Sequence, residues 1–221
     1  MTRSMRVEIW SDIVCPWCYI GKARFEEGLA AFDHRDRVEV VHRSFELDPD
    51  RPKGDTVPVL DMLTARYRVP REQAQAMEAR VAEAAADAGL GYRADRDHGN
   101  TFDLHRLLHL AKARGRQGDL LDLLYAANFA EERSVFDPAT LVSLAAEAGL
   151  DPDEARAVLD DDSAYADAVR ADEREAAELG ATAVPFFVLD RRFGVSGGQP
   201  AEIFTQALRQ AWEATQVSAE K

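Results

Sequence analysis

The chain has 221 residues, of which 46% are hydrophobic, enough for one large domain or for a small domain that carries an insertion. Its formal net charge of −13 argues against a nucleic-acid-binding surface, because phosphate contacts require clustered Lys and Arg. No apolar run approaches the roughly 18 residues of a membrane span, so we expect neither nucleic acid nor membrane as a partner.

The N-terminal sequence does not read as a secretory signal peptide. It lacks a basic region followed by an apolar segment and a small-residue cleavage site, although a mature exported protein would read the same way. We therefore expect a cytoplasmic protein. Thiols in the cytoplasm are usually reduced, so a close cysteine pair there serves catalysis or metal binding more often than structure.

The first segments in chain order predict a β-α-β unit. Residues 5–10 alternate apolar and polar side chains, as a half-buried strand does. After Pro16 the apolar residues recur with helical spacing to about Asp33, and residues 37–47 contain a β-favouring run of valines. The three segments together have the size of a β-α-β unit.

The next part of the chain is predicted to be helical for more than a hundred residues, after a turn-rich stretch at 48–58. In one of its helices Leu104, Leu107, Leu108 and Ala111 share one face. Two others open with Asp-Pro, an acidic N-cap followed by proline at the first helical position. The expected helices are 70–90, 100–115, 119–132, 137–150, 151–161 and 162–180.

Strand character returns near the C-terminus. Residues 184–190 form a compact apolar run, 191–198 supply a turn and a short strand, and 199–214 form an amphipathic helix. The order β-α-β, helices, β-β-α indicates a helical domain inserted into a small α/β domain. We expect the parts to be residues 1–60, 61–180 and 181–221.

The chain's two cysteines stand three positions apart in the sequence Cys15-Pro16-Trp17-Cys18. If Cys15 caps a helix, Pro16 takes the first helical position and Cys18 lies one turn on, so both sulfurs share a face and can form a disulfide. Amide groups at the helix start, with hydrogen bonds from the Trp17 N–H and the Cys18 thiol, favour the Cys15 thiolate. Cys15 is the expected attacking thiolate and Cys18 the resolving thiol.

Pro16, Trp17, Val184 and Pro185 are the expected substrate contacts. Trp17 places apolar surface beside the sulfurs, where it contacts a partner or covers the helix end. Pro185 opens a strand in the half of the fold that returns to the cysteines. A cis bond there would turn the Val184 backbone towards an extended peptide and exclude a metal-binding side chain, whereas a trans proline at an edge strand is the alternative.

The same cysteine pair could instead bind zinc. A structural site needs two more ligands, and His105 and His109 lie four residues apart on a predicted helix. Pro16 favours a helix start over a zinc knuckle, and the chain has no second cysteine pair, so we expect no metal site. A zinc-bound or redox-switched interaction module stays as one alternative.

Three stretches, WSDIVCPWCYIGKARFEEGL, GNTFDLHRLLHLA and GATAVPFFVLDRRFGVSGGQP, together resemble the FrnE-like branch of the DsbA family over nearly the whole chain. The resemblance implies an α/β thioredoxin fold with a large all-helical insertion. It implies thiol–disulfide oxidoreductase or isomerase activity on protein or small-molecule disulfides. It also assigns Val184 and Pro185 to the cis-proline loop, and it implies no tightly bound cofactor, with glutathione as a candidate redox partner.

The chain departs from parts of this family. Periplasmic members usually have histidine between the cysteines, so Trp17 predicts a less acidic Cys15 and a weaker oxidant. Related kappa-class glutathione transferases and 2-hydroxychromene-2-carboxylate isomerases use serine at the position of Cys15. The loop FGVSGGQ also lacks the Ser-Asp pair with which they bind glutathione. Two cysteines in this chain favour redox chemistry over the reactions of those enzymes. A glutathione-dependent isomerase or transferase acting on a hydrophobic small molecule stays as the close alternative.

Asn100, Thr101 and His105 resemble a recurrent segment of this branch and are candidates for the cleft opposite the sulfurs. Capping of a helix by Asn100 and packing of His105 would explain these residues as well. The sequence does not indicate the oligomeric state, the physiological substrate or the direction of electron flow.

Overall fold

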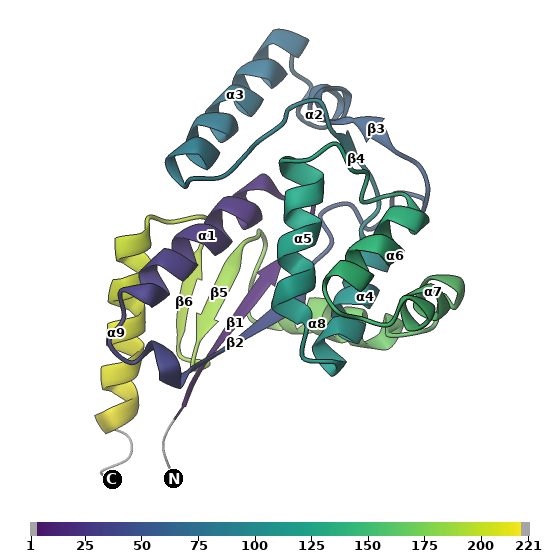
Figure 1. Cartoon of the computed structure of the whole chain (residues 1–221). Coiled ribbons are helices and arrows are strands. Elements are labelled where there is room, and N and C mark those ends of the chain that lie inside the picture. The colour runs from purple at the N-terminus through teal and green to yellow at the C-terminus, as the bar shows by residue number, and fades with distance from the viewer. Residues whose placement is uncertain (1–3, 218–221) are drawn as a thin grey trace.

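A four-stranded mixed sheet forms the centre of the α/β part, in the order β2-β1-β5-β6 (Figure 1). β1 (Met5–Ser11) pairs in parallel with β2 (Val38–Ser44) and antiparallel with β5 (Phe186–Leu189). β5 also pairs antiparallel with β6 (Phe193–Ser196). The structure, a computed structural model, describes residues 4–217.

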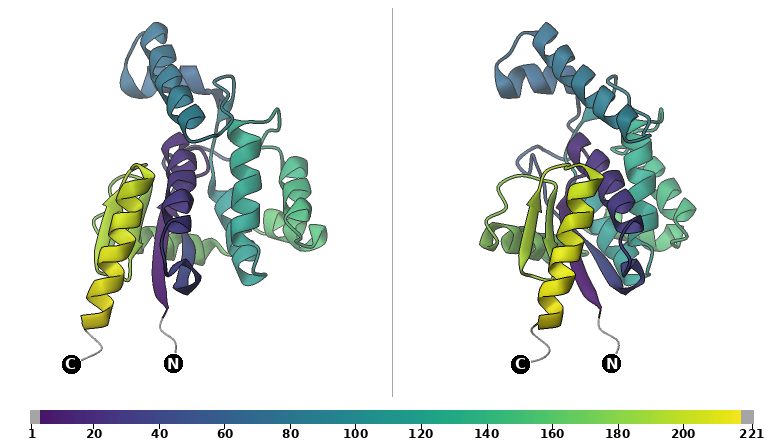
Figure 2. Two further views of the ribbon diagram at one scale, coloured as in Figure 1. Left: turned by 60° about the vertical axis from the view of Figure 1, so that its left-hand side comes forward. Right: turned by 90° about the vertical axis from the view of Figure 1, so that its left-hand side faces the viewer.

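α1 (Pro16–Ala30) and α9 (Ala201–Val217) lie side by side along the sheet (Figure 2). They bury its apolar side chains, among them Ile9 and Phe187, which pair across β1 and β5. The two helices approach closely because residue 28 is glycine: a Cβ there would lie 2.6 Å from the Ala201 carbonyl oxygen. The β-α-β start and β-β-α end are thus joined into one unit with the topology of a thioredoxin fold.

The long middle segment is mostly helical, as predicted. Its helices are α2 (Val59–Tyr67), α3 (Arg71–Asp87), α4 (Phe102–Ala113), α5 (Gln117–Phe129), α6 (Pro138–Glu147), α7 (Pro152–Asp160) and α8 (Ala166–Glu178). The carboxylates of Asp137 and Asp151 accept from backbone N–H groups of α6 and α7, so the two expected acidic N-caps are confirmed. The segment also contains strand β4 (Asp97–His98), which pairs with β3 (Val57–Pro58). A short 3-10 helix, Arg35–Arg37, precedes β2.

α4 differs from the expected helix with a single apolar face. Eight consecutive residues of α4, from Leu104 to Ala111, are buried, including His105, Arg106 and His109. The helix is enclosed because other helices and the sheet surround it, and its polar side chains find partners inside the protein. The sequence pattern identified the helix but not how deeply it lies.

α8 joins the helical segment to the sheet. The Trp10 indole N–H of β1 donates to the Asp172 carbonyl oxygen at 2.8 Å, and Arg43 of β2 pairs with the Asp172 carboxylate at 2.8 Å. Arg43 also pairs with the buried Glu8 of β1. These contacts fix the position of the helices relative to the strand that leads to the cysteines.

The order β-α-β, helices, β-β-α is the predicted one, whereas helix α2 and the two short strands β3 and β4 were not predicted. The division of the chain into parts at residues 60 and 180 stays a prediction. Among residues 4–217, none of the helices combines the length and apolar character that a transmembrane span requires.

Candidate active site

Cys15 occupies the N-cap of α1, with extended backbone angles (φ −86°, ψ 110°), and Pro16 follows at the first helical position. The Cys15 carbonyl accepts the N–H groups of Cys18 at 3.0 Å and Tyr19 at 3.2 Å, which closes the first turn. The proline lacks the N–H that a helix start would leave unpaired, and its ring fixes φ for the turn. The Cys-Pro-Trp-Cys sequence thus forms the N-cap and the first turn of α1, which hold both cysteines at the start of the helix.

Both thiols are reduced and buried, with 4% of Cys15 and 1% of Cys18 exposed. Burial raises the pKa of Cys18 well above its ordinary value, and hydrogen bonding to Cys15 adds to the increase. A thiol with a raised pKa is a poor first nucleophile at neutral pH, because the thiolate is the reacting form. Cys15 lines a pocket, described below, and Cys18 does not, so Cys15 is the more accessible of the two sulfurs.

The expected hydrogen bond from the Trp17 N–H to the Cys15 sulfur is absent, because the Cys15 side chain makes no capping contact with α1. Its thiol donates instead to the carbonyl oxygen of Val184, at 3.7 Å. The prediction of this backbone hydrogen bond was wrong for the thiol form. The Cys18 thiol is the remaining hydrogen-bond donor close to the Cys15 sulfur.

Val184 belongs to a loop that reaches the start of α1 from the other half of the α/β unit. The Val184–Pro185 peptide bond is cis, and Pro185 is packed against Gly21, where a Cβ would lie 3.0 Å from the proline Cγ. Among residues 4–217 the Val184 N–H has no acceptor. An unpaired N–H in the residue that contacts the Cys15 sulfur is available to an extended peptide.

A pocket of about 360 Å³ opens at Cys15 and is lined by four of the predicted site residues, Cys15, Pro16, Trp17 and Val184. Trp17 is 42% exposed, so it contributes apolar surface to the rim rather than covering the helix end completely. Helices α2 and α3 form the far side of the pocket. Figure 1 shows them beyond the N-terminal end of α1.

A buried carboxylate close to the cysteines was not among the predicted site residues. Asp12 is fully buried, accepts the Leu47 N–H at 2.7 Å, and lies 3.3 Å from Nε2 of His105. The charge of Asp12 adds to the raised pKa of Cys18, while its backbone contact opposes the increase. The sequence signal was a single acidic residue in the apolar run before Cys15.

The candidates at and before the start of α4 do not line the pocket at Cys15. Asn100 accepts the Phe102 N–H at 3.0 Å, and His105 contacts Asp12; neither lines the pocket at Cys15. Thr101 is buried at the N-cap of α4. A direct contact of Asn100 or His105 with substrate stays a prediction.

The histidines of the hypothetical zinc site point to different partners. His105 Nε2 faces Asp12, whereas His109 Nε2 lies 3.2 Å from Ser44 Oγ and 3.2 Å from Asp172. Within the described part of the chain, no three metal-ligating side chains come together. The two cysteines and two histidines do not form one cluster.

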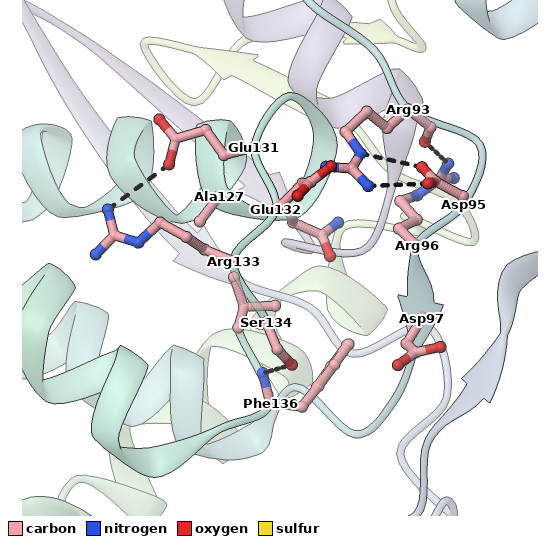
Figure 3. A pocket seen from close by; sticks show the side chains of 12 residues that line it. Arg93, Asp95, Arg96, Asp97, Ala127, Glu131, Glu132, Arg133, Ser134 and Phe136 are labelled. Carbon is pink, nitrogen blue, oxygen red and sulfur yellow. Dashed lines mark hydrogen bonds and ion pairs between the residues drawn. The ribbon is translucent and has the colours of Figure 1, made fainter.

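A second pocket, of about 420 Å³, lies between the β4 region and the end of α5 and does not include the cysteines. Several of its charged side chains pair with one another: Arg93 faces Asp95, and Arg133 reaches Glu131 (Figure 3). Paired charges leave little attraction for an ionic ligand. The pocket at Cys15 is therefore the better candidate for a substrate.

Comparison with known proteins gives a consistent result. Residues 6–209 match the model of the family described as DSBA-like thioredoxin domain. A crystal structure of a probable DsbA oxidoreductase from Streptomyces coelicolor is 71% identical, with a TM-score of 0.92 over 95% of this chain and 90% of that chain. YwbO of Bacillus subtilis (strain 168), an uncharacterized protein, is 27% identical over 93% of this chain and 96% of its own length.

A more distant structure shares the fold. The cytosolic disulfide reductase DsbM from Pseudomonas aeruginosa, solved with GSH, is 16% identical, with a TM-score of 0.61 over 98% of this chain and 100% of that chain.

Proposed function

Because this chain belongs to the family of proteins with a DSBA-like thioredoxin domain, we propose that it is a thiol–disulfide oxidoreductase in which Cys15 and Cys18 react. The family and the thioredoxin fold confirm the predicted resemblance, and placement in the FrnE-like branch is part of the proposal. The observation that carries the proposal is the pair of reduced thiols at the start of α1, with Cys15 against the Val184 loop.

The reaction proceeds through two exchanges. The Cys15 thiolate attacks one sulfur of a substrate disulfide, forming a Cys15–substrate disulfide and releasing the other sulfur as a thiolate. Cys18 then loses its proton and attacks the Cys15 sulfur, so that the Cys15–Cys18 disulfide forms and the substrate leaves as a thiolate. The substrate gains two electrons, and the enzyme dithiol loses them; the reverse sequence oxidises a substrate dithiol.

The surroundings of Cys18 support this order. Its raised pKa keeps it protonated until the mixed disulfide has formed, when the negative charge of a Cys15 thiolate is no longer beside it. Val184 supports the first step because its N–H can donate to the backbone of an extended substrate. Its carbonyl oxygen, which accepts from the Cys15 thiol, becomes available to the substrate once that thiol has ionised.

The proposed setting is the cytoplasm, with a low-molecular-weight thiol such as glutathione resetting the pair. Two equivalents of a monothiol reduce one Cys15–Cys18 disulfide and become one disulfide themselves. The support is the shared fold of the cytosolic disulfide reductase DsbM, which was solved with GSH.

A matched pair of variants tests the proposal. In Cys18→Ala the mixed disulfide on Cys15 cannot be resolved, so a stable adduct should accumulate with a peptide disulfide. In Cys15→Ala no such adduct should form on Cys18. Mass spectrometry under non-reducing conditions measures both, and equal adducts on the two variants would reject the assignment.

A glutathione-dependent isomerase or transferase is the second candidate, because the pocket at Cys15 is lined largely by apolar side chains that suit a hydrophobic small molecule. Such an enzyme does not need Cys18. Steady-state turnover that survives Cys18→Ala without an adduct would favour this candidate.

A further inference from the structure

The pocket at Cys15 has a lining that indicates what kind of disulfide it accepts. Its far wall comes from α2 and α3, outside the α/β unit that carries the cysteines. Both helices lie beyond the N-terminal end of α1 in each view of Figure 2. A substrate sulfur that reaches Cys15 therefore has its neighbouring groups against these two helices.

The floor of the pocket is apolar and adaptable. Val59 and Leu63 of α2 and Val81 of α3 are buried there, with Met62 and Met77 beside them. Methionine side chains are flexible and polarisable, so they adjust to apolar groups of different shape. The floor fits a large apolar side chain better than a polar one.

The rim carries aromatic surface in contact with water. Large hydrophobic side chains that are exposed within residues 4–215 are few, namely Trp17, Tyr67, Leu179 and Ile203. Two of these four, Trp17 at 42% and Tyr67 at 54%, stand at this pocket, on opposite walls. Exposed Trp and Tyr around an apolar depression are typical of a surface that binds a polypeptide.

One charge in the pocket lacks a counterion. Glu78 and Arg96 pair with each other at 2.7 Å, and burial lowers the pKa of His98, so that ring is neutral near pH 7. Arg66 donates to the Leu47 carbonyl at 3.3 Å, and no carboxylate of the described residues pairs with it. An unpaired arginine on a protein with a net charge of −13 is a specific point of attraction for an anionic group.

We propose that this pocket selects disulfide-bonded polypeptide segments that carry a large apolar residue beside the reacting cysteine and an acidic residue within reach of Arg66. The inference rests on the proposed thiol–disulfide function and adds the substrate class. A small zwitterionic thiol with two carboxylates and an ammonium group fits less well, because the lining offers it one unpaired cation and no unpaired acid.

The test uses peptides whose single cysteine is joined to pyridine-2-thiol. Attack of the Cys15 thiolate on the peptide sulfur forms the Cys15–peptide disulfide and releases pyridine-2-thione, whose absorbance gives the rate constant. The peptides carry Leu or Ser next to the cysteine and Glu or Gln two positions away from it. Each combination is made twice, with these residues on the N-terminal side and on the C-terminal side of the cysteine. The mixed disulfide of 2-mercaptoethanol with pyridine-2-thiol, which has neither group, reports the chemistry alone.

We expect the wild-type protein to prefer Leu over Ser by about tenfold, as burial of one large apolar side chain allows. We expect it to prefer Glu over Gln by about two- to fivefold, the range of an exposed ion pair. Arg66→Gln should abolish the Glu preference and keep the Leu preference. Tyr67→Ser should reduce the Leu preference. Arg80→Gln, which changes an exposed arginine of α3 outside the pocket, should leave both ratios unchanged.

The outcomes separate the two proposals. If the wild-type protein does not react even with the 2-mercaptoethanol mixed disulfide, the thiol–disulfide function itself fails. If it reacts but shows equal rates with all peptides, or if Arg66→Gln leaves the Glu preference intact, the substrate class is wrong. Faster reaction with the mixed disulfide of glutathione and pyridine-2-thiol, which has the same leaving group, than with the Leu and Glu peptide would also overturn it in favour of a small thiol.

Discussion

The sulfur of Cys15 lies 3.7 Å from the carbonyl oxygen of Val184, although 169 positions separate the two residues. The contact joins the start of α1 to the loop before β5, and the helical segment lies between them in the chain. The same segment returns to this point in space, because its helices α2 and α3 line the pocket at Cys15. The Cys15 sulfur thus faces a surface built from three distant parts of the sequence.

The two cysteines should differ in their reaction with an alkylating agent. Cys18 is 1% exposed and has a raised pKa, so it should stay unmodified through about pH 9, whereas Cys15 at the pocket should react at neutral pH. Iodoacetamide labelling of the reduced protein, followed by peptide mass spectrometry, gives the extent at each site. Equal labelling of both sulfurs at pH 7 would contradict the assignment of Cys15 as first nucleophile.

Because α1 and α9 approach closely at Gly28, a larger side chain at this residue should destabilise the fold. Gly28→Ala places a Cβ 2.6 Å from the Ala201 carbonyl oxygen and 2.9 Å from Phe204 Cβ, so α9 must move. We expect a loss of about 1–3 kcal/mol in the free energy of unfolding. Urea denaturation measures the change.

Gly118→Ala is the matched control for this substitution. Gly118 is exposed in the first turn of α5, and a Cβ at this residue would have no other atom within 4 Å. Alanine there should be neutral or stabilise the fold by up to about 1 kcal/mol. Equal effects of the two substitutions would show that helix propensity, and not the contact with α9, governs residue 28.

Local patterns in the sequence predicted the helices, the strands and the cysteine pair well, because each depends on residues that are close in the chain. The N-cap at Cys15 and the caps at Asp137 and Asp151 need only a few neighbouring residues to form. The pairing of Asp12 with His105 could not be predicted in this way, since it brings together residues that are 93 positions apart in the chain.

The lining of the pocket could not be predicted from the sequence for a similar reason. Met62 and Tyr67 lie in α2, which is not among the expected helices, and nothing in the local sequence shows that this segment faces Cys15. The Cys15 hydrogen bond was also mispredicted, because the competing acceptor, Val184, comes from the far end of the chain.

Arg106 should contribute strongly to stability. It is completely buried, pairs with Asp103, and donates to the carbonyl oxygens of Asp161 at 2.7 Å and Ala164 at 3.2 Å. Arg106→Met removes these donors and leaves buried acceptors without partners, so we expect a loss of about 3–5 kcal/mol. Thermal and urea unfolding measure the change.

An exposed arginine provides the comparison. Arg71 pairs with Asp61, but more than half of each side chain is exposed. Arg71→Met should cost no more than about 1 kcal/mol. A loss for Arg106→Met as small as that for Arg71→Met would mean that water replaces the buried contacts.

His42 should weaken the folded state in acid. Burial lowers its pKa to about 3, and the charges of Lys22 and Lys112 add to the decrease. The unfolded chain takes up this proton near pH 6.5, so between pH 6.5 and about 3 the unfolded state binds more protons and stability falls as the pH falls. Because part of the residue is still exposed to water, which screens the charge, we expect roughly 1–2 kcal/mol of the acid loss to come from His42. His42→Gln, which cannot take up the proton, should therefore lose less stability than the wild-type protein between pH 7 and pH 4. Urea unfolding of both proteins at the two pH values measures this difference, and parallel losses would show that His42 does not contribute to it.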